Sequence, residues 1–463
     1  MSAGRFLEIY QSNSKRYIDH LDRFLRFKSV STDPAFDKEC LKCADWLKGF
    51  LGDLGLESSL LDTSSKPVVY GEYKGDDNFP TVLYYGHYDV QPPEPLSEWI
   101  SPPFEPEVRN GRIYARGAQD NKGQTMYFLE ALGATIKEGL CRCTVKVFIE
   151  GEEETGSRGI SEAFPQWSSF ARGNVLMVCD TGVVPSGAPT IVMGLRGVGG
   201  MTVRLKGPRY DLHSGIHGGA VKNPAIEMAK IISSFFASDG SVSISGFYDG
   251  IEAPTKEELA LAKQGCPSDN EYAAIVGVMP DGGEAGLSLV ERACFRPTLE
   301  VNGIHSGYGG AGSKTIIPSE AEAKLSWRLV VGQDPNRVLK SIKQHIEAIC
   351  PPSITVSFTD EFSEGGAIKV SPNSQYVKIA REVLTELSDL EVVYRWEGAS
   401  VPVVAKICEA SGAEPLLVGF GTEEDRIHAP NESFLLDHFK RGFLYVASLL
   451  HKLSSVPLRE ISV

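Results

Sequence analysis

The chain has 463 residues, of which 42% are hydrophobic and 23% are charged. This is the composition of a globular protein, and the length allows two or more domains with hydrophobic cores of their own. The formal net charge of −14 disfavours nucleic acid and anionic membranes as partners, because both bind basic protein surfaces.

Residues 1–55 are predicted to form two helices joined by the loop VSTDPAFD. The first helix alternates charged and apolar residues and lacks the apolar stretch and the cleavage site of a signal peptide. No apolar run in the sequence reaches the roughly 18–20 residues that a membrane span requires. We therefore expect a cytoplasmic protein that does not associate with membranes.

The nine cysteines are scattered along the sequence, which is typical of reduced thiols in the cytoplasm. Cys40 and Cys43 form a CxxC pair, but no second pair follows at a suitable distance. We favour one turn of an amphipathic helix as the interpretation of this pair. A redox or zinc-thiolate role is the alternative.

Strand-like runs then alternate with helical patterns. The predicted strands are PVVYGEY, TVLYYGHYDV, TVKVFIEG and VLMVCD, and the predicted helices between them include GQTMYFLEALGATIKEGL and SRGISEAFPQW. The alternation indicates an α/β domain with a largely parallel sheet. From GLRGVGGMTVRLKGP onward the order becomes strand, helix, strand, strand, helix, strand. We predict one discontinuous α/β domain, residues 1–196 and 371–463, interrupted by a compact α+β insert, residues 197–370.

Side chains able to bind metal ions lie at the ends of the predicted strands and in the loops beyond them. These side chains are His87 and Asp89 after one strand, Asp120 before a helix, a run of glutamates in VFIEGEEETGS, Asp180 after VLMVCD, and His428 in a loop before the last helix. Active sites of open α/β sheets form at the carboxyl ends of the strands. Histidine and carboxylate ligands without thiolates suit zinc, manganese or cobalt at a catalytic site.

Taken singly, each of these residues has a structural interpretation. His87 would be a hydrogen-bonded histidine at a strand end, Asp120 a helix cap, and His428 a surface loop residue. Their joint arrangement favours a metal site instead, because carboxylates packed together repel unless cations lie between them. Two metal ions with a bridging carboxylate would also hold the attacking water and the substrate oxygen.

Several motifs resemble those of a known family of di-zinc amidohydrolases. The motifs are GHYDVQPPEP, ARGAQDNKGQ, EGEEETGS, DLHSGIHGG and EGASVPV, and the family includes cytosolic non-specific dipeptidase and carnosinase. Succinyl-diaminopimelate desuccinylase, acetylornithine deacetylase and glutamate carboxypeptidase belong to the same superfamily. The resemblance covers about residues 15–455. It implies an α/β zinc-peptidase-like catalytic domain with a mixed, largely parallel sheet, interrupted by a ferredoxin-like α+β lid or dimerisation domain, and it implies a homodimer.

The resemblance also implies two divalent metal ions per chain, with zinc expected and manganese or cobalt as alternatives. By motif, His87 and Asp180 would bind one ion, Glu154 and His428 the other, and Asp120 both. The peptide bond after Asp120 is implied to be cis.

Three further residues are implied to serve the reaction. Asp89 would accept a hydrogen bond from His87 and fix its tautomer. Glu153 would be the general base that takes a proton from the attacking water, with Glu152 as its main competitor within the run of glutamates. His213, in DLHSGIHGG, would donate to the oxyanion, in dimers from the neighbouring subunit.

Residues implied to contact the substrate are found further along the chain. Arg328 resembles the arginine that holds a substrate carboxylate. Thr315 and Asn302 resemble substrate contacts of the insert, and Gly398 and Ser400 resemble the loop beside the carboxylate.

The implied activity is hydrolysis of dipeptides or short peptides with a free C-terminus. The alternatives are a deacylase of N-acyl amino acids or a carboxypeptidase on the same scaffold, and more remotely a non-catalytic binding relative. Two departures from the family pattern bear on this choice. EFSEGGAIKV lacks the histidine that dipeptidase relatives often carry near Glu364, and Asn121 replaces the second aspartate common after the bridging residue.

Overall fold

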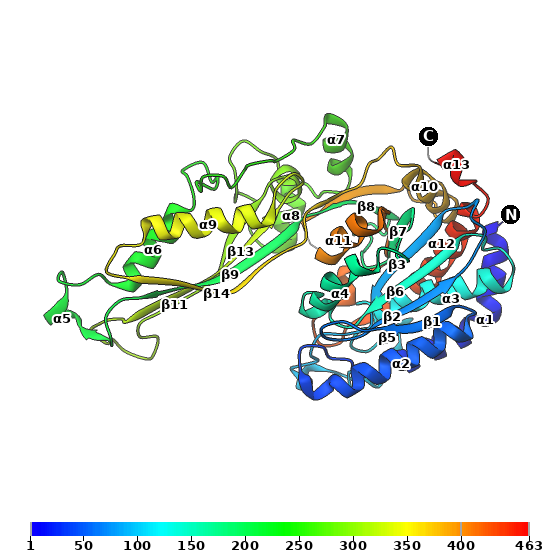
Figure 1. Cartoon of the computed structure of the whole chain (residues 1–463), viewed down its shortest axis with the longest axis horizontal. Helices are drawn as coiled ribbons and strands as arrows, with labels where there is room; N and C mark the ends of the chain where they lie inside the picture. The colour runs from blue at the N-terminus through cyan, green and yellow to red at the C-terminus, as the bar shows by residue number, and fades with distance from the viewer. Residues whose placement is uncertain (1, 399–400, 462–463) are drawn as a thin grey trace. The chain divides into compact units, whose positions relative to one another are not determined.

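The computed structural model describes residues 2–398 and 401–461 (Figure 1). These residues belong to two compact units. The first lies within Met1–Met193, Val370–Arg395 and Lys406–Val463, and the second within Gly194–Lys369 and Trp396–Ala405. Among the described residues, no helix is both long and apolar enough to cross a membrane.

The larger sheet, most of whose strands belong to the first unit, is parallel at its centre and antiparallel on either side. Its strand order is β1–β2–β6–β3–β7–β17–β8–β15, with β16 beside β8. The neighbours β6, β3, β7 and β17 run in one direction, whereas β2 is antiparallel to β6 and β8 is antiparallel to β17. The strands are β1 (Glu57–Leu61), β2 (Val68–Tyr73), β3 (Thr81–His87), β6 (Thr144–Glu150), β7 (Val175–Val178), β8 (Thr190–Leu195), β15 (Ile368–Lys369), β16 (Val393–Glu397) and β17 (Glu414–Leu417).

Helices cover this sheet. They are α1 (Ser2–Leu25), α2 (Asp37–Asp53), α3 (Lys122–Lys137), α4 (Arg158–Ala163), α10 (Gln375–Leu387), α11 (Pro402–Ser411), α12 (Leu436–Leu453) and α13 (Leu458–Ile461). Helix α2 packs on β1 and β2, while α12 packs on α1, α3 and α10. The buried side chains of α12 include Phe439, Phe443, Val446 and Leu450, whose spacing places them on one face of the helix.

A small separate sheet also lies in the first unit, with the order β18–β5–β4. Its strands are β4 (Glu107–Arg109), β5 (Arg112–Tyr114) and β18 (Ser433–Leu435). The pairing of β5 with β18 brings the segment just before α3 beside the segment just before α12. Two loops that are remote in sequence therefore meet next to α3.

The second unit contains an antiparallel sheet with the order β11–β13–β9–β14. Helices α6 and α9 lie along one face of this sheet (Figure 1), and their side chains form its core with those of β9 and β13. The elements are β9 (Gly197–Lys206), α6 (Pro224–Ser234), β11 (Thr298–Ser306), β13 (Glu320–Leu329), α9 (Pro335–Ile349) and β14 (Thr355–Glu364).

This succession of strand, helix, strand, strand, helix, strand and this strand order are those of a ferredoxin-like fold. The predicted α/β class with a ferredoxin-like α+β part is therefore confirmed. The sequence patterns did not show how much of the larger sheet is antiparallel. The unit also holds β10 (Leu212–His213), α5 (Ser214–His217), α7 (Lys256–Gln264), α8 (Asp269–Val276) and β12 (Ile316–Ile317).

Candidate metal centre

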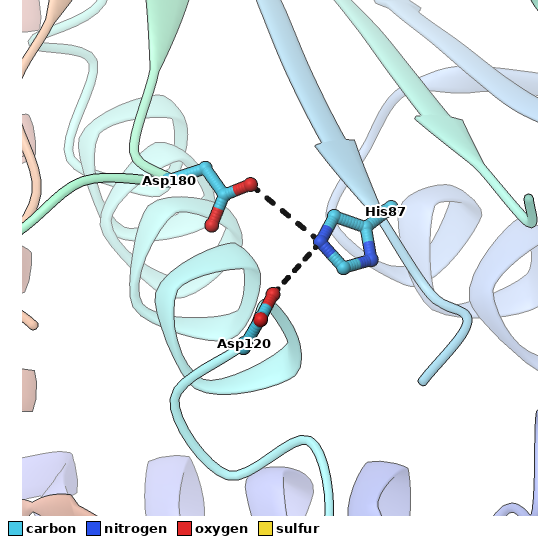
Figure 2. A group of neighbouring side chains, drawn as sticks. All are labelled: His87, Asp120 and Asp180. Carbon is cyan, nitrogen blue, oxygen red and sulfur yellow. Dashed lines mark hydrogen bonds and ion pairs between the residues drawn. The ribbon is translucent and has the colours of Figure 1, made fainter. Parts of the chain in front are cut away.

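The carboxyl ends of neighbouring parallel strands bring the first group of predicted ligands together. His87 is the last residue of β3, Asp180 follows β7, and Asp120 lies in the loop before α3. The His87 Nε2 atom is 3.1 Å from Asp120 Oδ1 and 3.6 Å from Asp180 Oδ2. Figure 2 shows both carboxylates directed at this one nitrogen. The imidazole is completely buried, so its position is held by the core of the sheet.

A second group forms around the other oxygen of Asp120. His428 Nε2 lies 3.0 Å from Asp120 Oδ2 and 3.3 Å from Glu154 Oε2. Asp120 therefore directs one carboxylate oxygen to each histidine. Among the described residues, the structure places His87, Asp120 and Asp180 in one possible metal-binding group and Asp120, Glu154 and His428 in another, and within each group the ligand atoms lie within 4.8 Å of one another.

The ionisation of these groups fits a site for divalent cations. Burial raises the pKa of Glu153 and of Glu154, and neighbouring carboxylates, Asp120 among them, raise both further. Hydrogen bonds to Asp120 and Glu154 raise the pKa of His428 to about 10. The carboxyl groups of the cluster thus disfavour one another's ionised form, and they favour the protonated form of His428. Cations bound by neutral imidazole and carboxylate would replace the protons on these groups, and this donor set suits zinc, manganese or cobalt.

Asp89 links His87 to the turn that carries Glu154. The Oδ1 atom of Asp89 is 3.4 Å from His87 Nδ1. Its two carboxylate oxygens also accept hydrogen bonds from the backbone N–H groups of Glu153 and Glu154, at 3.2 and 3.1 Å, in the 3-10 turn Glu153–Thr155. The imidazole therefore has Nδ1 facing Asp89 and Nε2 facing the other carboxylates.

The two candidate bases in the glutamate run have different surroundings. Glu152 is buried, and its carboxylate accepts hydrogen bonds from the backbone N–H groups of Gly159 (3.1 Å) and Lys66 (3.3 Å). The carboxyl of Glu153 instead lies close enough to the ligand cluster for the charges of His87 and Asp180 to act on its pKa. The carboxylate of Glu152 is thus hydrogen-bonded to the backbone, whereas the carboxyl of Glu153 lies within electrostatic range of the cluster.

Asn121 supplies a hydrogen bond that an aspartate could not. Its Nδ2 atom donates to Asp180 Oδ1 at 2.8 Å, and its Oδ1 accepts from the Thr125 hydroxyl at 2.7 Å. The second bond orients the amide so that its nitrogen faces the ligand. Gly86 leaves room for this pair, because a Cβ atom there would lie 2.7 Å from Thr125 Oγ1. The peptide bond between Asp120 and Asn121 is cis, as the motif resemblance implies.

The remaining predicted site residues lie in the second unit. His213 is exposed, and its Nδ1 accepts a hydrogen bond from the backbone N–H of Gly215 at 3.1 Å. Thr315 lies beside it, because β10 pairs with β12 and the Thr315 carbonyl accepts from the N–H of Ser214. Asn302 is the extra residue of a β-bulge in β11, a device that re-aims side chains.

Arg328 and Gly398 are connected through an arginine that the sequence analysis did not select. Arg196 donates from Nε to the Gly398 carbonyl (3.1 Å), and its Nη1 is 3.5 Å from Thr298 Oγ1. Thr298 is the direct cross-strand partner of Arg328. Burial lowers the pKa of Arg196 to about 10, and the charge of Arg328 adds to this shift. Two guanidinium groups thus lie near each other. Ser400 lies outside the described residues.

Sequence reasoning missed three residues that contact the metal-ligand candidates. Asn121 stood out only as a departure from a family pattern. Gln91 donates to Glu154 Oε2 at 2.7 Å, and Glu432 accepts from the backbone N–H of Asp120 at 3.2 Å. Both follow a predicted ligand histidine by four residues. This position close to a candidate ligand is the signal in the sequence, but it does not show which group each side chain contacts.

The CxxC pair lies in the interior of the first unit and does not belong to either ligand group. Burial raises the pKa of Cys40 to about 12 and that of Cys43 to about 11, so both thiols are protonated at mildly alkaline pH. We expect neither to react with iodoacetamide in the native protein, because the thiolate is the nucleophile. Peptide mapping by mass spectrometry would measure this, with the partly exposed Cys266 as internal comparison. Rapid alkylation of both would support the redox or zinc-thiolate alternative.

Comparisons with known proteins agree with the motif resemblance. Residues 83–452 match the model of peptidase family M20/M25/M40. The chain is 27% identical to the Cys-Gly metallodipeptidase dug1 of Schizosaccharomyces pombe, over 98% of this chain and 99% of that protein. It is 28% identical to the Beta-Ala-His dipeptidase of Mus musculus, over 84% of this chain and 80% of that protein.

A solved structure extends the similarity to the fold. The M20 family metallo-carboxypeptidase Sso-CP2 from Sulfolobus solfataricus superposes with a TM-score of 0.85 and 31% sequence identity, over 95% of this chain and 99% of that one. The chain belongs to peptidase family M20/M25/M40, and it is a metal-dependent peptidase.

Proposed function

We propose that the protein is a two-metal dipeptidase that hydrolyses dipeptides or short peptides with a free C-terminal carboxylate. The observation that carries this proposal is the position of Asp120, which directs one oxygen to His87 and the other to His428. A carboxylate placed in this way suits two cations that share it. The names of the relatives, a Cys-Gly metallodipeptidase and a Beta-Ala-His dipeptidase, support dipeptides as the substrate class.

In this proposal, five side chains hold the cations. They are His87 and Asp180 for one ion, Glu154 and His428 for the other, and Asp120 for both. When bound, such ions lower the pKa of water and polarise the substrate carbonyl. Asp89 keeps His87 in the orientation that presents Nε2 to the cluster, and Asn121 keeps Asp180 turned toward the same point.

Glu153 acts as the general base in this proposal. It takes a proton from the attacking water and delivers it to the leaving amine. The carboxylate of Glu152 is less suited to this role, because two backbone N–H groups already occupy it. His213 is proposed to donate to the oxyanion.

The substrate's terminal carboxylate is proposed to bind at Arg328, since a guanidinium can grip a carboxylate with two hydrogen bonds. The nearby guanidinium of Arg196 makes this part of the second unit more positive. Asn302, Thr315, Gly398 and Ser400 are proposed to contact the rest of the substrate.

We expect Arg328→Ala to raise KM for dipeptides by roughly 10–150-fold, since a hydrogen bond to a charged group contributes about 1.5–3 kcal/mol. The matched control is Arg204→Ala, in which an exposed arginine of the same sheet loses its pairing with Glu322. Steady-state kinetics on free and C-terminally amidated dipeptides would separate the two effects. The proposal predicts a loss for Arg328→Ala on the free form alone. An equal loss on both forms would contradict the assignment.

A carboxypeptidase is the second candidate, because Sso-CP2 carries that name at 31% identity and a TM-score of 0.85. A deacylase of N-acyl amino acids is the third. A panel of dipeptides, longer peptides, and N-acetyl and N-succinyl amino acids, assayed with Zn²⁺ or Mn²⁺, would separate the three. We expect dipeptides to be cleaved fastest. Cleavage of acyl amino acids alone would refute the dipeptidase assignment.

The homodimer, the cytoplasmic location, the lid or dimerisation role of the inserted domain, and the choice of zinc over manganese or cobalt stay predictions from the sequence. Light scattering on the purified protein and metal analysis by mass spectrometry would test the first and the last of these.

A further inference from the structure

A single buried carboxylate holds the loop that carries Asp120. Glu432 has no exposed surface. Its Oε2 atom accepts hydrogen bonds from Arg116 Nη1 (2.9 Å) and from the backbone N–H of Gly117 (2.8 Å). Its Oε1 atom accepts from the backbone N–H groups of Gln119 (3.1 Å) and Asp120 (3.2 Å). These four partners of the carboxylate are all donors, and all belong to the loop between β5 and α3.

The backbone of Glu432 makes a further hydrogen bond to this loop. Its carbonyl oxygen accepts from the N–H of Ala115 at 3.1 Å, just where β5 and β18 pair. The Nη2 atom of the same Arg116 guanidinium donates to the Pro92 carbonyl at 3.0 Å. Glu432 thus satisfies four backbone N–H groups of the loop between β5 and α3, those of Ala115, Gly117, Gln119 and Asp120. Movement of the loop away from this remote segment would leave these groups unpaired.

That remote segment also carries His428, four residues before Glu432. His428 has a backbone φ of 59°, in the left-handed region that residues other than glycine rarely adopt. Such a conformation persists where the surroundings enforce it. Glu432 thus connects the segment that carries His428 to the backbone of Asp120. The side chains of His428 and Asp120 lie 3.0 Å apart.

We infer that Glu432 is a positioning residue that sets the distance between Asp120 and His428 and thereby the affinity of the centre for divalent cations. The inference rests on the proposed metal centre and extends it by a residue that neither binds the cation nor transfers a proton. It acts through Asp120, whose backbone N–H it holds.

Glu432→Gln is the informative variant, because it keeps the shape of the side chain. An amide has one acceptor oxygen and an NH₂ group, whereas the carboxylate of Glu432 faces donors on both oxygens. The NH₂ group would therefore face N–H donors of either Arg116 and Gly117 or Gln119 and Asp120. The loop should shift without the loss of packing that alanine would cause.

Glu130→Gln is the matched control. Glu130 is a buried carboxylate of α3, and it lies 2.5 Å from His20 Nδ1. Its replacement also changes a hydrogen-bonded buried carboxylate of the first unit, but it leaves the loop before α3 in place. Arg116→Met provides a second test of the hydrogen bonds to Glu432, since it removes one donor and keeps the carboxylate.

The experiment uses metal-stripped full-length protein, titrated with Zn²⁺ in competition with a chelating dye and with Co²⁺ by visible absorption. We expect Glu432→Gln to weaken Zn²⁺ binding roughly 10–100-fold, the loss typical when a residue supporting a ligand is changed, and to alter the Co²⁺ spectrum. Glu130→Gln should bind as the wild type does, and Arg116→Met should fall between them. Saturating Zn²⁺ should restore more activity to Glu432→Gln than limiting Zn²⁺ does.

Wild-type affinity and spectrum in Glu432→Gln would overturn the inference, as would an equal loss in Glu130→Gln. If Glu432→Gln does not fold, wild-type affinity in Arg116→Met overturns it. Failure of the wild-type protein to bind Zn²⁺ or Co²⁺ would instead refute the proposed metal centre itself.

Discussion

Replacing Glu153 with alanine is expected to lower kcat by about 10²–10⁴-fold, the usual contribution of a general acid–base residue. The protein should still bind its metal ions, because the carboxyl of Glu153 belongs to neither ligand group of the described residues. Steady-state kinetics with a dipeptide and metal analysis of the same preparation would measure both quantities. A kcat close to that of the wild type would contradict the assignment.

Glu152→Ala is the matched control for this prediction. Its carboxylate accepts two backbone N–H bonds, so its loss should destabilise the fold by about 1–3 kcal/mol per buried donor left unpaired. Thermal unfolding should therefore change more than kcat does. If Glu152→Ala abolishes turnover and Glu153→Ala does not, the base is one position earlier in the glutamate run.

Asp120→Ala is expected to have the largest effect on metal content, because both ligand groups contain this residue. The loss of affinity should exceed the roughly 10–100-fold that follows from changing an outer partner of a ligand. Both ions should be weakened together. Elemental analysis after dialysis, compared with the wild-type protein, would show this.

Asp180→Ala and His428→Ala provide the comparison, since each removes a ligand from one group alone. Each should retain the ion of the other group more firmly than Asp120→Ala retains either ion. Two firmly bound ions in Asp120→Ala would contradict the shared role of this side chain.

The sequence predicted candidate metal ligands at the strand ends for a physical reason. Parallel strands end at a common sheet edge, so a histidine after one and an aspartate after another must lie close together. His87 and Asp180 meet this condition, since β3 and β7 are parallel neighbours. His428 lies 308 residues from Asp120. The sequence offered it as a loop histidine able to bind a metal ion, but only the motif resemblance assigned it to the same centre as Asp120.

Other parts of the site could not be predicted, because they depend on tertiary hydrogen bonds. Strand alternation does not orient Asp89, because β3 ends at His87. Asp89 is aimed instead by the N–H groups of Glu153 and Glu154. The hydrogen bonds of Glu432 and of Asn121 join segments that are separate in the sequence. The hydrophobic periodicity of the sequence does not indicate that these segments are in contact. The outer antiparallel strands likewise depend on pairing that a strand pattern alone does not specify.

The placement of Asp120 has a thermodynamic consequence. In the proposed two-metal centre, two cations that share this carboxylate would not bind independently, because the first to arrive would fix the rotamer and part of the charge that the second encounters. One bound ion changes the binding free energy of the other, and thermodynamic linkage requires this change to be the same whichever ion binds first. Occupancy of the two positions should therefore follow interdependent stepwise constants. A substitution that removes a ligand of one ion alone would then also change the affinity of the protein for the other ion.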